Sequence, residues 1–375
     1  MSRQLSTILT TTFALLDQFQ DTLSPKTAAQ AAQSTPKDAD GLPLLSASSS
    51  ALRAQVTKLS LLALTTPFTH SAVSGILRDV NDSILPSLVT ASLLVTPTAY
   101  TKAFHSEVLV LAKAALVEFA SLIQEVKIIA DKKDEQKNDN KKESELVQSE
   151  KNAVTVATGR TWDACDAVTN IANKGVVGFV IRRVEQWRDL VRDAVEEIED
   201  WDPEDDGDEF FDGVMDDDDD KDDDKDDEDS EEDAEEDKEN TAALQEQKKA
   251  TIRFLKPVAQ IYPAIISNRL KNTGNTPLSP VSRITKLESL MLNLQHIPDQ
   301  VDEAAGALYE ADVDRSVEYL KEVKKCATQA VDSVVSPWDA SAGAEDKFTV
   351  WSKTWLKVMD EVSKPISSAT IHEQT

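Results

Sequence analysis

Apolar residues recur every three or four positions in several long stretches of the chain. This spacing follows one face of an α-helix, so each stretch predicts an amphipathic helix. The two longest lines are Leu109, Ala112, Leu116, Phe119, Ile123, Val126 and Ala130, and Val177, Val180, Val184, Trp187, Val191, Ala194 and Ile198. The same spacing joins Phe348 to Val362, and a line of smaller residues runs from Ala153 to Ile171.

Proline residues, often beside Ser, Thr or Asp, separate these periodic stretches, as at Pro25, Pro67 and Pro97. Such residues end one helix or cap the next, and the pattern predicts about ten or eleven helices. Glycine is scarce, with 10 in 375 residues, and aromatic residues make up only 5%. A β-sandwich or barrel would need more of both. We therefore predict an all-α fold of antiparallel helical bundles.

Two stretches do not share the helical pattern, and they suggest the domain boundaries. Residues 131–144 are of mixed charge and contain no apolar residue, which predicts an exposed linker or a frayed helix end. Residues 201–240 are strongly acidic. We expect a first bundle over residues 1–130, and a second over residues 145–200 and 241–375 into which the acidic segment is inserted.

The acidity of the chain belongs to that insertion. Residues 201–240 hold 26 Asp and Glu against 3 Lys, a net charge of −23, so the other 335 residues carry only −5 of the total of −28. Repelling charges with little to bury predict a disordered segment. It is either a solvated spacer that aids solubility or a polyanion that binds histones or other basic proteins. The charge disfavours nucleic acid as a partner, because phosphate contacts need a basic surface.

The sequence offers no catalytic or metal-binding motif. The four histidines lie far apart without ligand spacing, and neither a phosphate-binding glycine loop nor a nucleophile elbow is present. The acidic run lacks the central glycine of a calcium-binding loop. Cys165 falls on the line of small residues, which favours packing in the core over a nucleophile. We expect a protein that is not an enzyme and binds no cofactor or metal.

Cysteine usage and hydropathy bear on where the protein works. Two cysteines cannot build a disulfide framework, which is typical of an intracellular chain. The most apolar window, residues 84–97, is too short to span a bilayer and contains Pro86. We therefore expect no membrane segment.

Three hydroxyl groups stand in sequences that kinases favour. Ser230 is followed by acidic residues, and Ser279 and Thr35 each precede proline. A phosphate on Ser279 would lie near a predicted helix N-terminus, where negative charge is stabilising. We expect these three positions to be candidate phosphorylation sites.

Two sequence blocks resemble a known family. They are "TGRTWDACDAVTNIANKG" (Thr158–Gly175) and "LQHIPDQVDEAAGALYE" (Leu294–Glu310). The chain resembles the cyclin-D-binding protein family, also called the GCIP or cyclin-D-interacting family. The matching positions are Trp162, Ala164, Cys165, Asp299 and Tyr309.

The resemblance implies helical bundles similar to talin-rod and vinculin domains. It also implies a non-enzymatic adaptor, found in nucleus and cytoplasm, that binds D-type cyclins and helix-loop-helix transcription factors. Family members act as negative regulators of cell-cycle progression and transcription. The acidic tract of this chain is longer than the family's usual one.

The leading hypothesis is thus a cell-cycle or transcription regulator that works by protein–protein contact. An apolar groove, or an exchangeable helix seam, would receive an amphipathic partner helix. The seams Leu109–Ala130 and Val177–Ile198 are candidates for such pairing, with intramolecular core as the main alternative. Two other functions stay open: an acidic-tract binder of histones or similar basic proteins, and a vinculin- or talin-like cytoskeletal adaptor.

Overall fold

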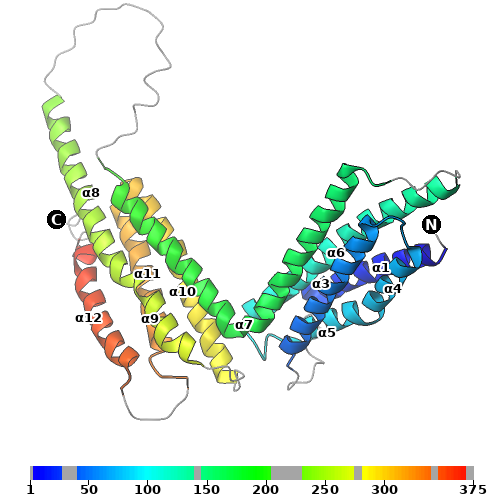
Figure 1. The fold of residues 1–375 in the computed structure, drawn as a ribbon. Coiled ribbons are helices and arrows are strands. Elements are labelled where there is room, and N and C mark those ends of the chain that lie inside the picture. Colours follow the sequence, from blue (N-terminus) through cyan, green and yellow to red (C-terminus); the bar gives the residue numbers. More distant parts are fainter. Residues whose placement is uncertain are drawn as a thin grey trace, which may run out of the picture. The chain divides into compact units, whose positions relative to one another are not determined.

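The computed structural model describes residues 3–27, 40–138, 145–203, 230–273, 281–338 and 345–368 (Figure 1). All regular structure in these ranges is helical, which confirms the predicted all-α fold. The chain divides into two compact units. Unit 1 comprises Met1–Phe179 and Pro277–Thr285, and unit 2 comprises Val180–Thr276 and Lys286–Thr375.

The helices of unit 1 pack as a bundle. They are α1 (Arg3–Thr22), α3 (Leu42–Leu64), α4 (His70–Asp79), the π-helical turn η1 (Val80–Ile84), α5 (Leu85–Leu94), α6 (Lys102–Asn138) and the first part of α7 (Gln148–Asp200). Helix α1 contacts α4 and α6, and α3 contacts α4, α5 and α6. The first part of α7 runs antiparallel along α3, as hydrogen bonds from Ser46 to Asn173 and from Thr158 to Ser60 show.

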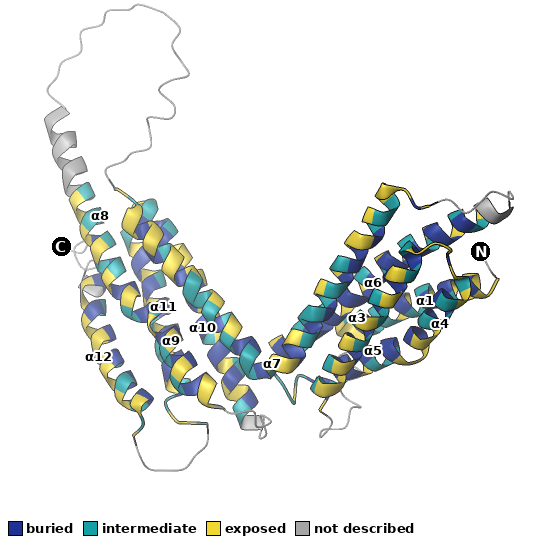
Figure 2. Ribbon diagram, viewed as in Figure 1, coloured by how far each residue is buried: buried dark blue, intermediate teal, exposed yellow. Residues whose placement is uncertain are grey.

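The core of unit 1 includes one of the two longest predicted seams. Its seven residues, from Leu109 to Ala130 along α6, are all buried (Figure 2). They face the other helices of the same bundle, because burying this apolar line inside the unit removes it from water. The interpretation of this seam as a face for a partner helix is therefore wrong, and the alternative of intramolecular core is confirmed.

Unit 2 is a second bundle. It holds the rest of α7 and α8 (Ser230–Ala259), α9 (Ile261–Ile265), the π-helical turn η3 (Ile266–Leu270), η4 (Lys271–Thr273), α10 (Val281–Tyr309) from Lys286 onward, α11 (Val313–Ser333) and α12 (Lys347–Ser368). Helix α8 packs on α11 and α12, and Trp355 Nε1 donates a hydrogen bond of 2.9 Å to the Pro257 carbonyl. In the Val177–Ile198 seam, the residues Val180, Val184, Val191 and Ile198 are fully buried. This part of the seam is core rather than a pairing face, while Val177, Trp187 and Ala194 are half-buried.

A buried arginine ties several elements of unit 2 together. Arg269, on the turn η3, is only 3% exposed. It donates to the carbonyls of Val334 and Val335 at the end of α11, at 2.5 and 2.7 Å. It also forms a two-pronged ion pair with Asp346, at 2.7 and 3.1 Å. Asp346 in turn caps α12 by accepting from the Thr349 backbone N–H at 2.8 Å.

The division between the units differs from the predicted one. The sequence placed the start of the second bundle at Glu145, after the charged linker, but α6 continues helically to Asn138 and α7 contributes its first part to unit 1. The break lies inside α7 instead, where Gly175 has φ 61° and ψ −170°. This conformation is essentially reserved for glycine. Charge alone does not end a helix, whereas a glycine in this backbone conformation does.

The acidic segment is only partly described. Residues 204–229 lie outside the described residues, and α8 begins at Ser230. Residues 139–144 of the predicted linker also lie outside them. Among the described helices, none combines the length and the hydropathy that a membrane span requires.

Candidate interaction surfaces

The described histidine side chains lie apart from one another and form no cluster with cysteine, aspartate or glutamate. His70 Nε2 lies 3.0 Å from Asp134 Oδ1, while His296 is exposed on α10. His372 falls outside the described residues. Within the described ranges, no three side chains of His, Cys, Asp or Glu gather as metal ligands do.

The first block of family-like residues lies on α7 in unit 1. Trp162 is half-buried, and the guanidinium carbon of Arg53 lies 5.2 Å from the centre of its ring. Arg53 Nε is also 2.9 Å from Asp166 Oδ1. These three side chains join α3 to α7 at the surface, and we call them the Arg53–Trp162–Asp166 cluster. A cation over an indole ring is a stabilising pair.

The two neighbouring family-like residues have packing roles. Ala164 is half-buried, and Cys165 is buried. The Cys165 carbonyl accepts a hydrogen bond of 2.8 Å from Ser49 Oγ on α3. Burial raises the pKa of the Cys165 thiol to about 12, so the reactive thiolate is scarce at neutral pH.

The second block lies on α10 in unit 2. Asp299 is exposed. The Tyr309 ring is 5.0 Å from the ring of Trp201, just beyond the end of α7. Burial, with the charges of Glu197 and Asp302 beside it, raises the pKa of Tyr309 to about 12. The two blocks therefore belong to different units, and neither assembles a nucleophile with a base.

The candidate phosphorylation sites receive little structural detail. Thr35 and Ser279 lie outside the described residues. Ser230 is the first residue of α8. A helix dipole stabilises a phosphate group at the helix N-terminus. Phosphorylation of Ser230, Ser279 and Thr35 stays a prediction.

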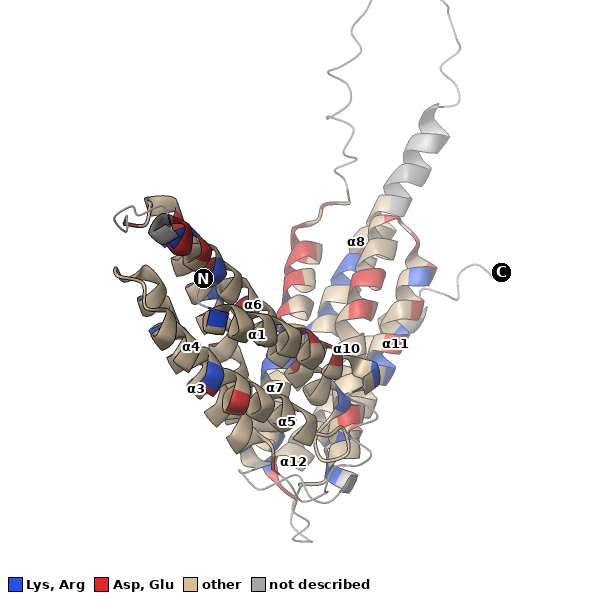
Figure 3. Cartoon of the chain, turned by 90° about the vertical axis from the view of Figure 1, so that its right-hand side faces the viewer, with Lys and Arg blue, Asp and Glu red and all other residues tan. Residues whose placement is uncertain are grey.

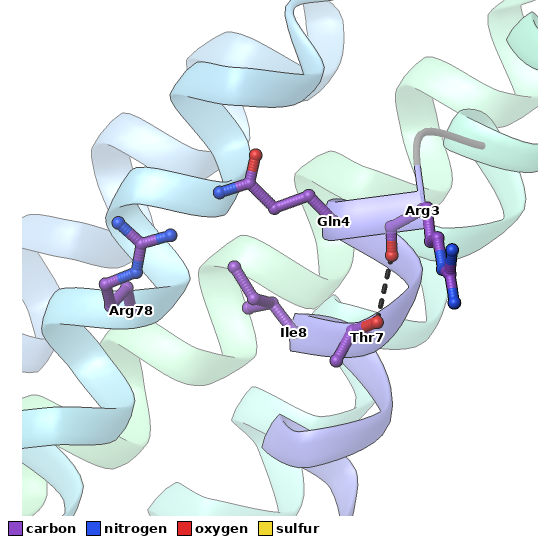
Figure 4. A pocket seen from close by; sticks show the side chains of 5 residues that line it. All are labelled: Arg3, Gln4, Thr7, Ile8 and Arg78. Atoms are coloured by element: carbon purple, nitrogen blue, oxygen red, sulfur yellow. Dashed lines mark hydrogen bonds between the residues drawn. The ribbon is translucent and has the colours of Figure 1, made fainter.

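One surface recess lies between α1 and α4 (Figure 4). It has a volume of about 450 Å³ and is lined by Arg3, Gln4, Thr7 and Ile8 of α1 and by Arg78 of α4. Gln4 and Ile8 point toward Arg78 in Figure 4, and the Thr7 hydroxyl donates to the Arg3 carbonyl at 2.9 Å. The recess is wide open to solvent, and its side chains include no acid–base pair.

A more extended feature is the outer face of α6, opposite its buried seam. Val110, Val117 and Ile128 are exposed by 61%, 41% and 46%. They are 7 and 11 residues apart, which is close to two and three helical turns, so they lie on one line. Three uncharged residues, Ala114, Ser121 and Gln124, are exposed between them. We call these six residues the α6 stripe.

A groove lies beside the α6 stripe. It measures about 480 Å³ and is lined by Gln20 of α1 and by Val117, Ala120, Ser121, Gln124 and Glu125 of α6. The ammonium group of Lys127 lies 6.0 Å from the centre of the Phe13 ring, which connects α1 to α6 near the groove. We call this feature the α1–α6 groove.

Sequence reasoning missed the α6 stripe because it followed only the stronger apolar line on the same helix. The signal was present, since Val110, Val117 and Ile128 are apolar and two or three turns apart. Alanine, serine and glutamine stand between these three residues, so the apolar spacing on this face of the helix is interrupted and does not stand out from the sequence alone.

Comparison with known proteins agrees with the family resemblance. The family model described as "Grap2 and cyclin-D-interacting, N-terminal" matches residues 44–204. This range contains nearly all of α3 and the whole of α4, α5, α6 and α7. No curated protein and no solved structure matches the chain. The resemblance to the cyclin-D-interacting family is thus confirmed over residues 44–204, and the likeness to talin-rod and vinculin domains stays a prediction.

Proposed function

We propose that this protein, whose residues 44–204 match the Grap2 and cyclin-D-interacting family, is a non-enzymatic adaptor that binds a D-type cyclin. The observation that carries the proposal is the place of the match. It covers most of unit 1, including α6 and the part of α7 that packs on α3. Unit 1 is therefore the cyclin-binding part in this proposal.

The exposed features of unit 1 support binding to a protein rather than to a small molecule. The α6 stripe is an extended line of exposed uncharged residues, three of them aliphatic, and exposed apolar surfaces mark contact sites when they are extended. The Arg53–Trp162–Asp166 cluster adds Trp and Arg, the residue types that contribute most to binding energy at interfaces. Both features lie within the matched range.

The proposed role is negative regulation of cell-cycle progression, in the cytoplasm and the nucleus. A cyclin held by an adaptor is removed from its other partners by mass action. In this proposal the acidic segment is an accessory that raises solubility or steers the approach of partners through its charge.

The test uses the purified full-length chain and an immobilised D-type cyclin, read by biolayer interferometry. We expect saturable binding to the D-type cyclin and none to an A-type cyclin. A variant in which a neutral linker replaces residues 204–229 should bind with the same affinity. Absence of binding by the intact chain would refute the proposal. Loss of binding only in the deletion variant would instead assign the function to the acidic segment.

A further inference from the structure

We infer that the α6 stripe and the α1–α6 groove form the docking site for the partner, and that the docking element is an amphipathic helix whose apolar face is bordered by Lys or Arg. The inference rests on the proposed function, because the partner tested is a D-type cyclin. It adds the surface, the kind of element that binds and the charge of that element.

The geometry of the stripe fits a helix lying along it. Val110 and Ile128 are 18 residues apart, which is five helical turns or about 27 Å along the axis. Other exposed aliphatic residues do not line up in this way: Leu44 and Leu61 on α3 are 17 residues apart, and Val350 and Val358 on α12 are 8 apart. Scattered apolar residues are normal on a surface, whereas an aligned set presents an apolar face.

The docking surface is held in place before any partner arrives. Directly behind the stripe, Leu116, Phe119 and Ile123 of the same helix are fully buried in the core of unit 1. A rigid surface loses little conformational entropy on binding, which favours affinity. The α1–α6 groove beside Val117 provides room for side chains that project from the partner helix.

The charges around this surface specify the partner. Glu125 lines the groove, Asp131 and Glu135 follow the stripe on exposed positions of α6, and Asp17 and Asp21 flank Gln20 on α1. These five carboxylates outnumber the three basic residues with access to the same surface, Lys113, Lys127 and Lys132, and Lys132 is already paired with Glu150.

Complementary charges speed association and select the partner. A helix bordered by Lys or Arg is therefore attracted, and an acidic or phosphorylated one is repelled. The same argument disfavours a second copy of this chain as the partner, because the two copies would bring the same carboxylates together across the interface.

The main test is the variant Val117→Glu in the full-length protein. It places a charge at the centre of the stripe, and we expect binding to the immobilised D-type cyclin to weaken at least roughly tenfold. Val117→Leu keeps the apolar surface and should bind as the wild type does. Leu292→Glu introduces the same charge at an exposed leucine of α10 in unit 2, and it should leave affinity unchanged.

Two further measurements identify the docking element. A photoreactive benzoylphenylalanine in place of Ser121 should cross-link to a cyclin helix that carries Lys or Arg beside its apolar face, as mapped by mass spectrometry. The double variant Glu125→Lys/Asp131→Lys should slow association, and the effect should diminish at high salt.

The outcomes separate the inference from the proposed function. If the wild type binds the cyclin and Val117→Glu binds equally well, the docking site is wrong while the cyclin-binding function stands. If the wild type binds no D-type cyclin, both fall. If light scattering shows a wild-type dimer that Val117→Glu converts to a monomer, the stripe binds a second copy and the inference is overturned.

Discussion

The two units connect their helices with different chemistry. In unit 1 the buried contacts between helices are neutral: Thr158 Oγ1 donates to Ser60 Oγ at 2.9 Å, and Thr161 Oγ1 donates to the Glu118 carbonyl at 3.1 Å. The ion pairs between its helices, such as Arg53 with Asp166, keep access to water. In unit 2, beside neutral contacts, several contacts between elements are ionic, and the cation of one of them, Arg269, is buried. Lys324 Nζ lies 2.9 Å from Asp360 Oδ1, and the Arg269 network joins η3, α11 and α12.

The same difference appears in the density of charge. Residues 40–101, which run from α3 through α5, contain 6 charged side chains in 62 residues, and few charges colour these helices in Figure 3. Residues 180–203, the second part of α7 and its end, contain 12 in 24. Neutral hydrogen bonds depend little on pH or salt, whereas charged ones depend on both. Two bundles of one fold class should therefore respond differently to solution conditions.

The π-helical turns show the contrast at matching places. In the part of the chain that the structure describes, each unit has one such turn with a buried polar side chain, Asn81 on η1 and Arg269 on η3. Asn81 Nδ2 donates to Thr12 Oγ1 at 2.9 Å, while its Oδ1 has no partner among the described residues. Arg269 uses all three of its nitrogen atoms. Loss of Arg269 should therefore cost more than loss of Asn81.

The largest effect is expected for Arg269→Met. The substitution keeps an unbranched apolar stem but removes the guanidinium group, which leaves Asp346 without its cation and the Val334 and Val335 carbonyls without their donor. We expect the free energy of unfolding of unit 2 to fall by about 3 kcal/mol, the lower end for a broken buried ion pair, because Asp346 keeps partial access to water. Urea unfolding followed by tryptophan fluorescence measures it, since five of the six tryptophans lie in unit 2.

The two buried cysteines make the assignment to one unit possible. Cys165 lies in unit 1 and Cys326 in unit 2. Under native conditions, Arg269→Met should speed thiol labelling at Cys326 and leave the rate at Cys165 unchanged. Equal acceleration at both cysteines would show that the units do not unfold independently, and the comparison would then fail.

The next effect concerns pH. The hydrogen bonds from Arg269 hold the pKa of Asp346 well below its ordinary value. A carboxyl whose pKa is depressed in the folded state stabilises the fold above its unfolded pKa, near about 4, and that contribution is lost as the pH falls toward the folded pKa. Asp346→Asn should therefore lower the urea midpoint of unit 2 at pH 7, with the difference from wild type shrinking below about pH 4.

A matched substitution makes this interpretation specific. Asp163→Asn removes an exposed carboxylate from α7 in unit 1, and it should shift neither midpoint. If the gap between wild type and Asp346→Asn stayed constant down to pH 3, the ion pair with Arg269 would not be the source of the stability.

Much of the fold follows from the sequence for a clear physical reason. The seam from Leu109 to Ala130 needs burial along its whole length, and a long helix in a bundle is the simplest way to bury it. Prolines indicate some of the helix ends, although Pro257, Pro298 and Pro365 lie inside α8, α10 and α12. Local pattern is sufficient for these features because periodicity and capping are local properties.

The domain boundary and the α6 stripe depend on information that is not local. The first part of α7 packs on α3 through pairs such as Ser49 with the Cys165 carbonyl, and the pairing of small polar residues far apart in sequence leaves no periodic signal. The conformation of Gly175 likewise leaves no periodic signal. The stripe became visible only once the core face of α6 was assigned.

Gly175 is the break in α7, four residues before the first segment of unit 1 ends at Phe179, and its substitution is the third test. Alanine there would be held at a positive φ of 61°, which we expect to cost about 1–3 kcal/mol. Gly159, in the first part of the same helix, is the control, because a Cβ atom there meets nothing within 4 Å. Gly159→Ala should instead stabilise unit 1 by about 0.5–1 kcal/mol. Thermal unfolding and labelling of Cys165 measure both; a cost for Gly159→Ala, or none for Gly175→Ala, would contradict the assigned break in α7.

The smallest effect, and the closest test of the comparison, is expected for Thr158→Val in unit 1. Valine keeps the shape of threonine but removes the hydroxyl that donates to Ser60 Oγ, both residues being buried. The cost should be about 1 kcal/mol, because the buried hydroxyl of Ser60 loses its partner.

The double variant Ser60→Ala/Thr158→Val removes both polar groups, so it should cost less than the sum of the two single substitutions. Since no charge is involved, labelling of Cys165 in these variants should give the same differences in low and high salt, whereas the difference caused by Arg269→Met at Cys326 should shrink with salt. A salt-dependent effect of Thr158→Val would mean that charged groups contribute to this contact, and the two units would not differ in the way the structure indicates.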